Sequence, residues 1–142
     1  MNKTIIFDFN RTLYDPDQEQ LLPDAIDVVA ALKTRGYTLH LISRGKEGRA
    51  KKISALPIYS YFDSVIVTDE KKLDDFKELF KNSEENFVIG DRIKREIYLG
   101  NCVGATTIWI KNGKFANELP SSKDEEPTYT VASPAEILSL LL

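Results

Sequence analysis

Short apolar runs alternate with amphipathic segments along almost the whole chain. Segments with apolar residues three and four positions apart, at residues 23–37, 47–56, 73–82 and 94–101, are expected to be helices. A closing helix is expected to begin at Ser133 and Pro134. The runs rich in Ile, Val, Phe or Leu are too short for helices and are expected to be strands: Thr4–Phe9, Thr38–Ser43, Ser64–Thr68, Asn86–Gly90, Thr106–Ile110 and Tyr129–Val131.

This alternation constrains the fold class more than any other feature. Sequential parallel strands need crossover connections, and amphipathic helices of this length are the usual crossovers. We therefore expect a three-layer α/β fold, with helices on both faces of one parallel sheet. The 142 residues match the size of one compact domain, and residues 114–127 are expected to form an irregular loop.

Polar residues follow several of the predicted strands. Asp8 comes at the end of the first strand, Ser43 at the end of the second, Lys71 just after the third and Asp91 after the fourth. Because ligands of open parallel sheets bind outside the carboxyl ends of the strands, we expect these side chains to converge at one rim. Asp8 and Asp91 provide the hard oxygen ligands that Mg²⁺ prefers. The sequence therefore predicts a magnesium site.

The same rim is expected to bind a phosphoryl group. Ser43 and the backbone N–H groups of Arg44 and Gly45 lie in a predicted strand-to-helix turn, where they could hold phosphoryl oxygens. The charge of Lys71 would neutralise those oxygens during phosphoryl transfer.

Four motifs in this order resemble those of the haloacid dehalogenase (HAD) superfamily. They are "DFNRTL" at residues 8–13, "LIS" ending at Ser43, a lysine in "DEKKLDDF", and "IGDRIKRE" at residues 89–96. The resemblance covers nearly the whole chain and implies a Rossmann-like domain. Lys71 is favoured as the third-motif residue because Phe76 then occupies the family's usual helix position, and Lys72 is the alternative.

The resemblance also implies the role of each site residue. Asp8 would be the nucleophile that forms an aspartyl-phosphate, and Mg²⁺ would be bound by Asp8, the backbone carbonyl of Asn10, Asp91 and the substrate phosphate. Thr12 would brace the loop, and Glu96 would orient the third-motif lysine or a metal-bound water. The implied function is that of a Mg²⁺-dependent phosphatase or phosphotransferase.

Asn10 departs from the family pattern. Phosphatases of the family place a second Asp here, which protonates the leaving oxygen and then activates water, and a neutral amide does neither. We therefore expect Asp8 to attack but hydrolysis to be slow. The alternative is a catalytically impaired module that binds a phosphorylated ligand or a protein partner. A receiver-like signalling domain does not fit, because its phosphorylated Asp follows the third strand.

No cap domain is expected at either of the family's insertion points. Residues 12–23 and the segment between Ser43 and Lys71 are too short to hold one. Family members without caps act on large phosphorylated substrates or are covered by a neighbouring subunit. A macromolecular phosphorylated substrate and an oligomer are therefore both open alternatives.

The charge and the cysteine content of the chain indicate which binding partners and which cellular location to expect. A net charge of −3 and a pI near 5.3 argue against a nucleic-acid partner and an anionic membrane surface. The lone Cys102 excludes an internal disulfide and a Cys-rich metal site. Because no signal-peptide pattern or long apolar span is present, a cytoplasmic location is expected.

Overall fold

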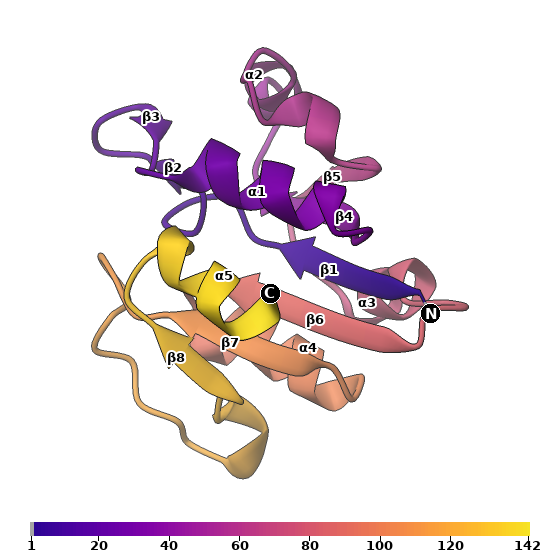
Figure 1. Cartoon of the computed structure of the whole chain (residues 1–142). Helices are drawn as coiled ribbons and strands as arrows, with labels where there is room; N and C mark the ends of the chain where they lie inside the picture. Colours follow the sequence, from indigo (N-terminus) through magenta and orange to yellow (C-terminus); the bar gives the residue numbers. More distant parts are fainter. Residues whose placement is uncertain (1) are drawn as a thin grey trace.

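The computed structural model describes residues 2–142, and within them one sheet has six parallel strands (Figure 1). The strand order is β5-β4-β1-β6-β7-β8. The bounds are β1 (Lys3–Phe7), β4 (Thr38–Arg44), β5 (Ser64–Thr68), β6 (Glu85–Gly90), β7 (Thr106–Ile110) and β8 (Tyr129–Val131). The predicted parallel sheet is therefore confirmed.

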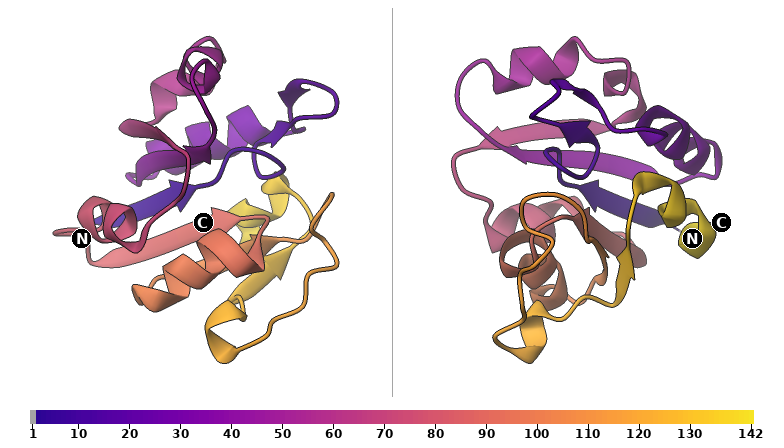
Figure 2. Two further views of the ribbon diagram at one scale, coloured as in Figure 1. Left: turned by 180° about the vertical axis from the view of Figure 1, so that it is seen from behind. Right: turned by 90° about the vertical axis from the view of Figure 1, so that its left-hand side faces the viewer.

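Helices cover both faces of this sheet, which completes the predicted three layers. On the face nearest the viewer in Figure 1 lie α1 (Ala25–Thr34) and α5 (Pro134–Leu141). On the opposite face, in front in the left panel of Figure 2, lie α3 (Leu73–Leu79) and α4 (Tyr98–Cys102). The remaining helix, α2 (Arg49–Ser54), packs through Ile53 into the same core as α1.

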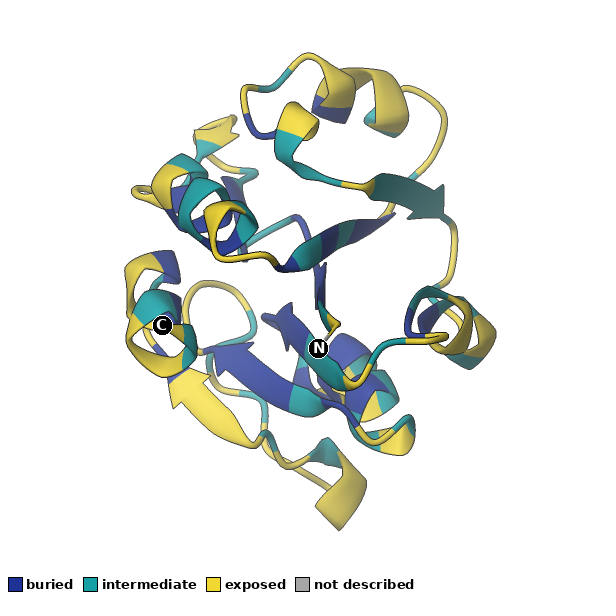
Figure 3. Ribbon diagram, turned by 45° about the vertical axis from the view of Figure 1, so that its right-hand side comes forward, coloured by how far each residue is buried: buried dark blue, intermediate teal, exposed yellow. Residues whose placement is uncertain are grey.

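Both faces of the central strands are apolar. In β1, Ile5 and Phe7 belong to the core beneath α1 and α5, whereas Ile6 belongs to the core beneath α3, which contains Phe76. This alternation follows from the period of two of a strand and from burial on both faces. Figure 3 shows the result as buried central strands between helices whose outer sides are exposed.

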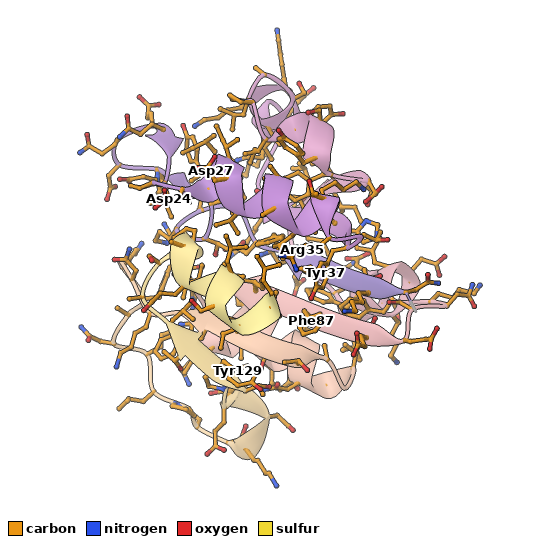
Figure 4. All side chains as sticks on the ribbon, in the orientation of Figure 1. Asp24, Asp27, Arg35, Tyr37, Phe87 and Tyr129 are labelled. Atoms are coloured by element: carbon orange, nitrogen blue, oxygen red, sulfur yellow. The ribbon has the colours of Figure 1, made fainter. Side chains whose placement is uncertain are left out.

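Aromatic residues attach α5 to the sheet. The rings of Tyr37 and Phe87, both labelled in Figure 4, meet edge to face with centroids 6.0 Å apart. The hydroxyl of Tyr37 donates a hydrogen bond to the carbonyl of Leu141 in α5, at 3.1 Å. The last helix is thus held by a buried aromatic cluster as well as by its own apolar side.

The first strand ends two residues earlier than expected, at Phe7. The N–H of Asp8 still donates to the carbonyl of Ile89 at 2.9 Å, but the chain then turns, because the N–H groups of Leu13 and Tyr14 both donate to the carbonyl of Phe9. A two-stranded hairpin that the sequence did not predict follows, formed by β2 (Tyr14–Asp15) and β3 (Gln20–Leu21).

Three further segments differ from the sequence-based expectation. The helix expected at residues 94–101 begins with a π-helical segment, η2 (Ile93–Ile97), before α4. The loop at residues 114–127 contains a short 3₁₀ helix, η3 (Lys123–Glu125), and another, η1 (Tyr59–Tyr61), precedes β5. Each is a single turn or little more, below the length that a periodic pattern reveals.

The topology determines where a ligand binds. The chain passes from β1 to β4 on one side and later returns to β6 on the other, so the strand order reverses at β1. Open α/β sheets bind ligands at such a switch point, outside the carboxyl ends of the strands. Only the β2–β3 hairpin lies between β1 and α1, and only α2 and η1 lie between β4 and β5. In the part of the chain that the structure describes, neither insertion point holds a cap.

None of the helices among residues 2–142 combines the length and the apolar character that crossing a bilayer requires.

Candidate active site

A cleft of about 330 Å³ opens at the carboxyl ends of β1, β4 and β6. Its acidic residues are Asp8, Asp91 and Glu96. Its basic residues are Arg11, Arg44, Lys71, Arg92, Arg95 and Lys114. The excess of basic side chains in a chain of net charge −3 makes this cleft suited to an anionic ligand.

Asp8 and Lys71 form an ion pair at the base of the cleft. The Nζ atom of Lys71 lies 2.5 Å from Oδ1 of Asp8, and the two side chains are only 5% and 10% exposed. The hydroxyl of Thr12 donates to Oδ2 of Asp8 at 3.1 Å. Burial raises the pKa of the Asp8 carboxyl, but the charge of Lys71 and the hydrogen bonds outweigh it, and the pKa lies below its ordinary value. Asp8 is therefore ionised at neutral pH.

The structure distinguishes the two candidate lysines. Lys71 is buried, and its Nζ atom also lies 3.5 Å from Oε2 of Glu96. Burial lowers the pKa of Lys71, but the charges of Asp8 and Glu96 raise it above its ordinary value, so the ammonium stays protonated. Lys72 is exposed and stands at the start of α3, where its N–H donates to the carboxylate of Asp75. Only Lys71 reaches the cleft.

Asp91 follows β6 and is held from two sides. Its Oδ2 accepts a hydrogen bond from Nε of Arg11 at 2.8 Å, and its backbone carbonyl accepts one from the indole N–H of Trp109 at 2.8 Å. Burial and the negative charges of Asp8 and Glu96 raise the pKa of Asp91 to about 9 despite the contact with Arg11. Asp91 thus holds a proton at neutral pH when no other cation is present.

Glu96 lies in η2 and is fully enclosed. Its Oε1 accepts the N–H of Arg92 at 3.1 Å, and its Oε2 faces Lys71. A Cβ atom at Gly90 would lie 2.2 Å from Cγ of Glu96, so only glycine fits at that position. Burial and the charge of Asp8 raise the pKa of Glu96. The expected role of Glu96 in orienting Lys71 stays a prediction.

The three acids together suit a divalent cation. Each of Asp8, Asp91 and Glu96 offers a carboxylate oxygen, and these oxygens all lie within 4.8 Å of one another. Buried carboxylates this close repel one another, as the raised pKa of Asp91 indicates. A hard divalent cation such as Mg²⁺ would relieve that repulsion, so these residues fit the expected metal.

Asn10 lines the cleft beside Asp8 and is engaged by a residue that sequence analysis did not single out. The Nη1 atom of Arg49 donates to Oδ1 of Asn10 at 3.2 Å, and the guanidinium lies 5.6 Å from the centre of the Phe9 ring. Arg49 belongs to α2, and its position in an amphipathic segment resembled that of any surface cation. The side chain at position 10 therefore has a cationic neighbour and no titratable group of its own.

The expected phosphate-binding turn is only partly present. Ser43 is buried and lines the cleft, and its hydroxyl donates a long hydrogen bond, 3.4 Å, to the carbonyl of Arg44. The N–H of Gly45, in contrast, donates to the carbonyl of Thr68 at 3.0 Å. The expectation that Gly45 offers a free N–H is wrong for this structure, because the pairing of β4 with β5 continues one residue past Arg44. Arg44 does line the cleft, through its side chain.

The loop after β7 forms one wall of the cleft, which the sequence did not indicate. Phe115 lies there with the guanidinium of Arg92 3.8 Å from its ring centre and that of Arg11 4.9 Å away. Arg92 also donates two hydrogen bonds to Glu118, at 3.0 and 3.2 Å. Arg11 and Arg92 adjoin recognisable motifs, but no local signal marked Phe115.

Comparisons with known proteins agree with this geometry. Residues 72–137 match a family model described as HAD-hydrolase-like. Curated relatives named glyceraldehyde 3-phosphate phosphatase are 25% identical in Methanopyrus kandleri and 29% identical in Pyrococcus furiosus, over 84% of this chain. The pyrimidine 5'-nucleotidase PynA of Streptococcus pneumoniae is 27% identical over 90% of this chain. The chain spans about half the length of these relatives: 55%, 54% and 57%.

Solved structures show the same fold. The HAD-hydrolase YfnB of Bacillus subtilis, which was crystallised with magnesium, superimposes with a TM-score of 0.79 at 14% identity, over 99% of this chain and 98% of that one. A HAD phosphatase from Thermococcus onnurineus gives a TM-score of 0.71 at 17% identity, over 98% and 97% of the two chains.

Proposed function

We propose, since the chain belongs to the HAD-like hydrolase superfamily, that residues 1–142 form one HAD-like domain that hydrolyses phosphate esters of small molecules with Mg²⁺. The observation that carries this proposal is the ionised Asp8 paired with Lys71 at the base of a cationic cleft. The names of the curated relatives, phosphatases and a nucleotidase, support a small phosphorylated substrate.

In the first step, a carboxylate oxygen of Asp8 attacks phosphorus, and the bond from phosphorus to the ester oxygen breaks. The leaving oxygen takes the bonding electron pair and then a proton, and Asp8 becomes an aspartyl-phosphate. Lys71 and the hydroxyl of Ser43 face the phosphoryl oxygens and stabilise the charge that spreads over them. Water then cleaves the aspartyl-phosphate and regenerates Asp8.

The metal would be held by Asp8, Asp91 and the backbone carbonyl of Asn10. When bound, Mg²⁺ supplies positive charge next to the phosphoryl oxygens. Thr12 supports Asp8 through its hydrogen bond, and Glu96 positions Lys71 through its ion pair.

The hydrolysis of the aspartyl-phosphate lacks a general base at position 10. Asn10 has no ionisable proton, and its amide oxygen accepts from Arg49. Water must therefore attack the aspartyl-phosphate without a general base, at a cost of roughly a hundred-fold to ten-thousand-fold in rate. Slow hydrolysis or transfer to another acceptor follows from this arrangement.

A trapped adduct tests the proposal directly. After incubation with acetyl phosphate and Mg²⁺, intact-mass and peptide analysis should find one phosphoryl group on Asp8, and Asp8→Asn should remain unmodified. Lys71→Met should suppress the adduct, whereas the matched variant Lys72→Met should form it normally, because Lys72 is exposed and outside the cleft. Thermal melting of each variant separates loss of chemistry from loss of folding.

The absence of both adduct and phosphate release in the wild-type protein would contradict catalysis. It would favour the alternative function, a module that binds a phosphorylated ligand or partner at the same cleft. Such a module does not need an acid or base at position 10, so Asn10 would not impair it.

The remaining expectations about partners belong to this proposal. The negative net charge supports the expectation that neither nucleic acid nor a membrane surface is a partner. A single exposed Cys102, unpaired among residues 2–142, suits a cytoplasmic location. A macromolecular substrate and an oligomer stay predictions.

A further inference from the structure

A second cleft, of about 440 Å³, adjoins the first and is called here the side cleft. Arg44, Lys71 and Arg95 line both clefts. Tyr98 and Leu99 of α4 form an apolar part of the side cleft. A ligand whose phosphoryl group lies at Asp8 can therefore extend past these three cations into the side cleft.

The two arginines shared by the clefts are poorly neutralised. Among residues 2–142, the guanidinium of Arg95 has no ion-pair partner, whereas Arg92 pairs with Glu118 and Lys94 with Glu125. Arg44 donates its Nε–H to the backbone carbonyl of Asp69 at 2.9 Å, which leaves its terminal amino groups without a carboxylate.

The electrostatics around Arg95 indicate the same crowding of positive charge. Burial lowers the pKa of Arg95, and so do the charges of Arg92 and Arg44, while Glu96 and Glu118 offset this only in part. Two guanidinium groups that repel each other beside an open cleft would be stabilised by an anion between them.

We propose that Arg44 and Arg95 bind a second anionic group of the substrate, a carboxylate or a phosphate, while the group to be hydrolysed lies at Asp8. This inference rests on the proposed function and specifies its substrate class: a small phosphate ester with a second anionic group. Guanidinium groups bind carboxylates and phosphates through paired N–H donors, so a hydroxyl at the same position would be a much weaker ligand.

Two acidic residues of the side cleft limit the charge of that substrate. Asp69 and Glu70 line the side cleft with exposed carboxylates. A third anionic group placed there would be repelled, whereas an apolar or neutral group would contact Tyr98 and Leu99. The side cleft therefore suits a compact substrate with two anionic groups and not an extended polyanion.

Matched pairs of substrates test this inference. The compounds 3-phosphoglycerate and glycerol 3-phosphate have the same carbon chain and differ in a carboxylate against a hydroxymethyl group. Propane-1,3-diol bisphosphate and 3-hydroxypropyl phosphate make the same comparison for a second phosphate. In at least one pair, we expect the wild-type protein to prefer the member with the second anionic group by about tenfold or more in kcat/KM, the size of one charge-assisted hydrogen bond.

The variants Arg95→Gln and Arg44→Gln should remove that preference by slowing only the member with the second anionic group, and Arg95→Lys should keep part of it. Arg35→Gln is the control. Arg35, labelled in Figure 4, is exposed and lies between α1 and the start of β4, near the amino ends of the strands and therefore away from the two clefts at their carboxyl ends. It should leave the preference unchanged.

Binding provides a readout that is independent of turnover. Titration calorimetry of the same compounds into Asp8→Asn with Mg²⁺, with and without Arg95→Gln, should show the same discrimination. If no compound is hydrolysed but the discrimination in binding depends on Arg95, the proposed function fails and the second-anion site stands. Equal losses for the members with and without the second anionic group, no preference in the wild type, or no binding of either member would overturn the second-anion site even if hydrolysis is observed.

Discussion

At the scale of single residues, the acids of the cleft differ in their pKa values. Asp8 faces Lys71 and has a lowered pKa, whereas Asp91 lies next to two other acids and has a pKa raised to about 9. Burial acts against the charged form of both carboxyls. The charge of Lys71 and the hydrogen bonds outweigh burial at Asp8, whereas Arg11 does not offset burial and the charges of Asp8 and Glu96 at Asp91. This division leaves a charged carboxylate, the proposed nucleophile, beside a protonated carboxyl, the proposed metal ligand.

Mg²⁺ binding should therefore depend on pH. Below pH 9 a cation must displace the proton of Asp91, so its affinity rises with pH, by up to about tenfold per pH unit for one released proton. We expect Mg²⁺ to raise the melting temperature more at about pH 8.5 than at about pH 6.5. Asp91→Asn should reduce the rise at both values. A rise of equal size at both pH values in the wild-type protein would contradict the assignment of Asp91.

We expect position 10 to control the fate of the proposed aspartyl-phosphate. Asn10→Asp restores a carboxyl group that can activate water, and phosphate release should accelerate about tenfold or more, which corresponds to at least about 1.4 kcal/mol of transition-state stabilisation. The lifetime of the adduct on Asp8 should shorten by the same factor.

Arg49 should affect the two steps of the reaction differently. It already donates to Asn10, and it would hold an introduced carboxylate in its ionised form, which suits a base but not an acid. The double variant Asn10→Asp with Arg49→Gln should protonate the leaving group better than Asn10→Asp alone. Identical adduct lifetimes in wild type and Asn10→Asp would show that position 10 does not control hydrolysis.

At the scale of elements, two helices hold the polar groups of the cleft from the same face of the sheet. α3 is anchored by the fully buried Phe76, which sets the position of Lys71 before its first turn. The π-helical segment η2 carries Glu96, whose side chain passes over Gly90 at the end of β6. The ion pair of Lys71 with Glu96 thus connects the two helices through the site.

Gly90→Ala should disturb this connection. The added Cβ would overlap Cγ of Glu96, so we expect a loss of about 1–3 kcal/mol in unfolding free energy and a loss of turnover. The double variant Gly90→Ala with Glu96→Ala removes the overlap and should recover stability but not full turnover, because Lys71 loses a positioning contact. Denaturant unfolding and phosphate release measure the two effects separately. An unfolding free energy of Gly90→Ala equal to that of the wild type would refute the close contact between Gly90 and Glu96.

At the scale of the whole molecule, the charge is unevenly distributed. The chain carries a net charge of −3, yet six basic side chains border one cleft at the carboxyl edge of the sheet. Helices cover both faces of that sheet, and the cleft has no cap over it among residues 2–142. An anionic substrate should therefore be attracted to an open and solvent-accessible cleft.

Salt should weaken this attraction. Raising the ionic strength from about 0.01 to about 0.15 M shortens the screening length from about 30 to about 8 Å, so kcat/KM for a phosphate ester should fall. The fall should appear mainly in KM, because the buried pair of Asp8 with Lys71 is shielded from the added ions. Arg95→Gln should show a shallower dependence than Arg35→Gln. A KM that does not change with salt would argue against electrostatic attraction of the substrate.

The sequence alone determined the layered fold and the residues at the strand ends. Apolar runs and amphipathic segments encode strands and helices locally, and parallel connections then bring Asp8, Ser43, Lys71 and Asp91 to one rim, because all strands end at the same edge. The preference for Lys71 over Lys72 came from the resemblance to the HAD superfamily, which places Phe76 at the family's usual helix position.

Only the tertiary structure decided how the site is completed. Gly45 lost its expected role because its N–H pairs with Thr68 on the neighbouring strand. Arg49 and Phe115 joined the site from segments without a motif, and Arg95 joined it from a position of the fourth motif to which sequence analysis assigned no role. Such contacts depend on the packing of elements far apart in the chain, which no local pattern specifies. The charges of Asp8 and Asp91 were decided in the same way, because burial and the distance to Lys71 exist only after the chain has folded.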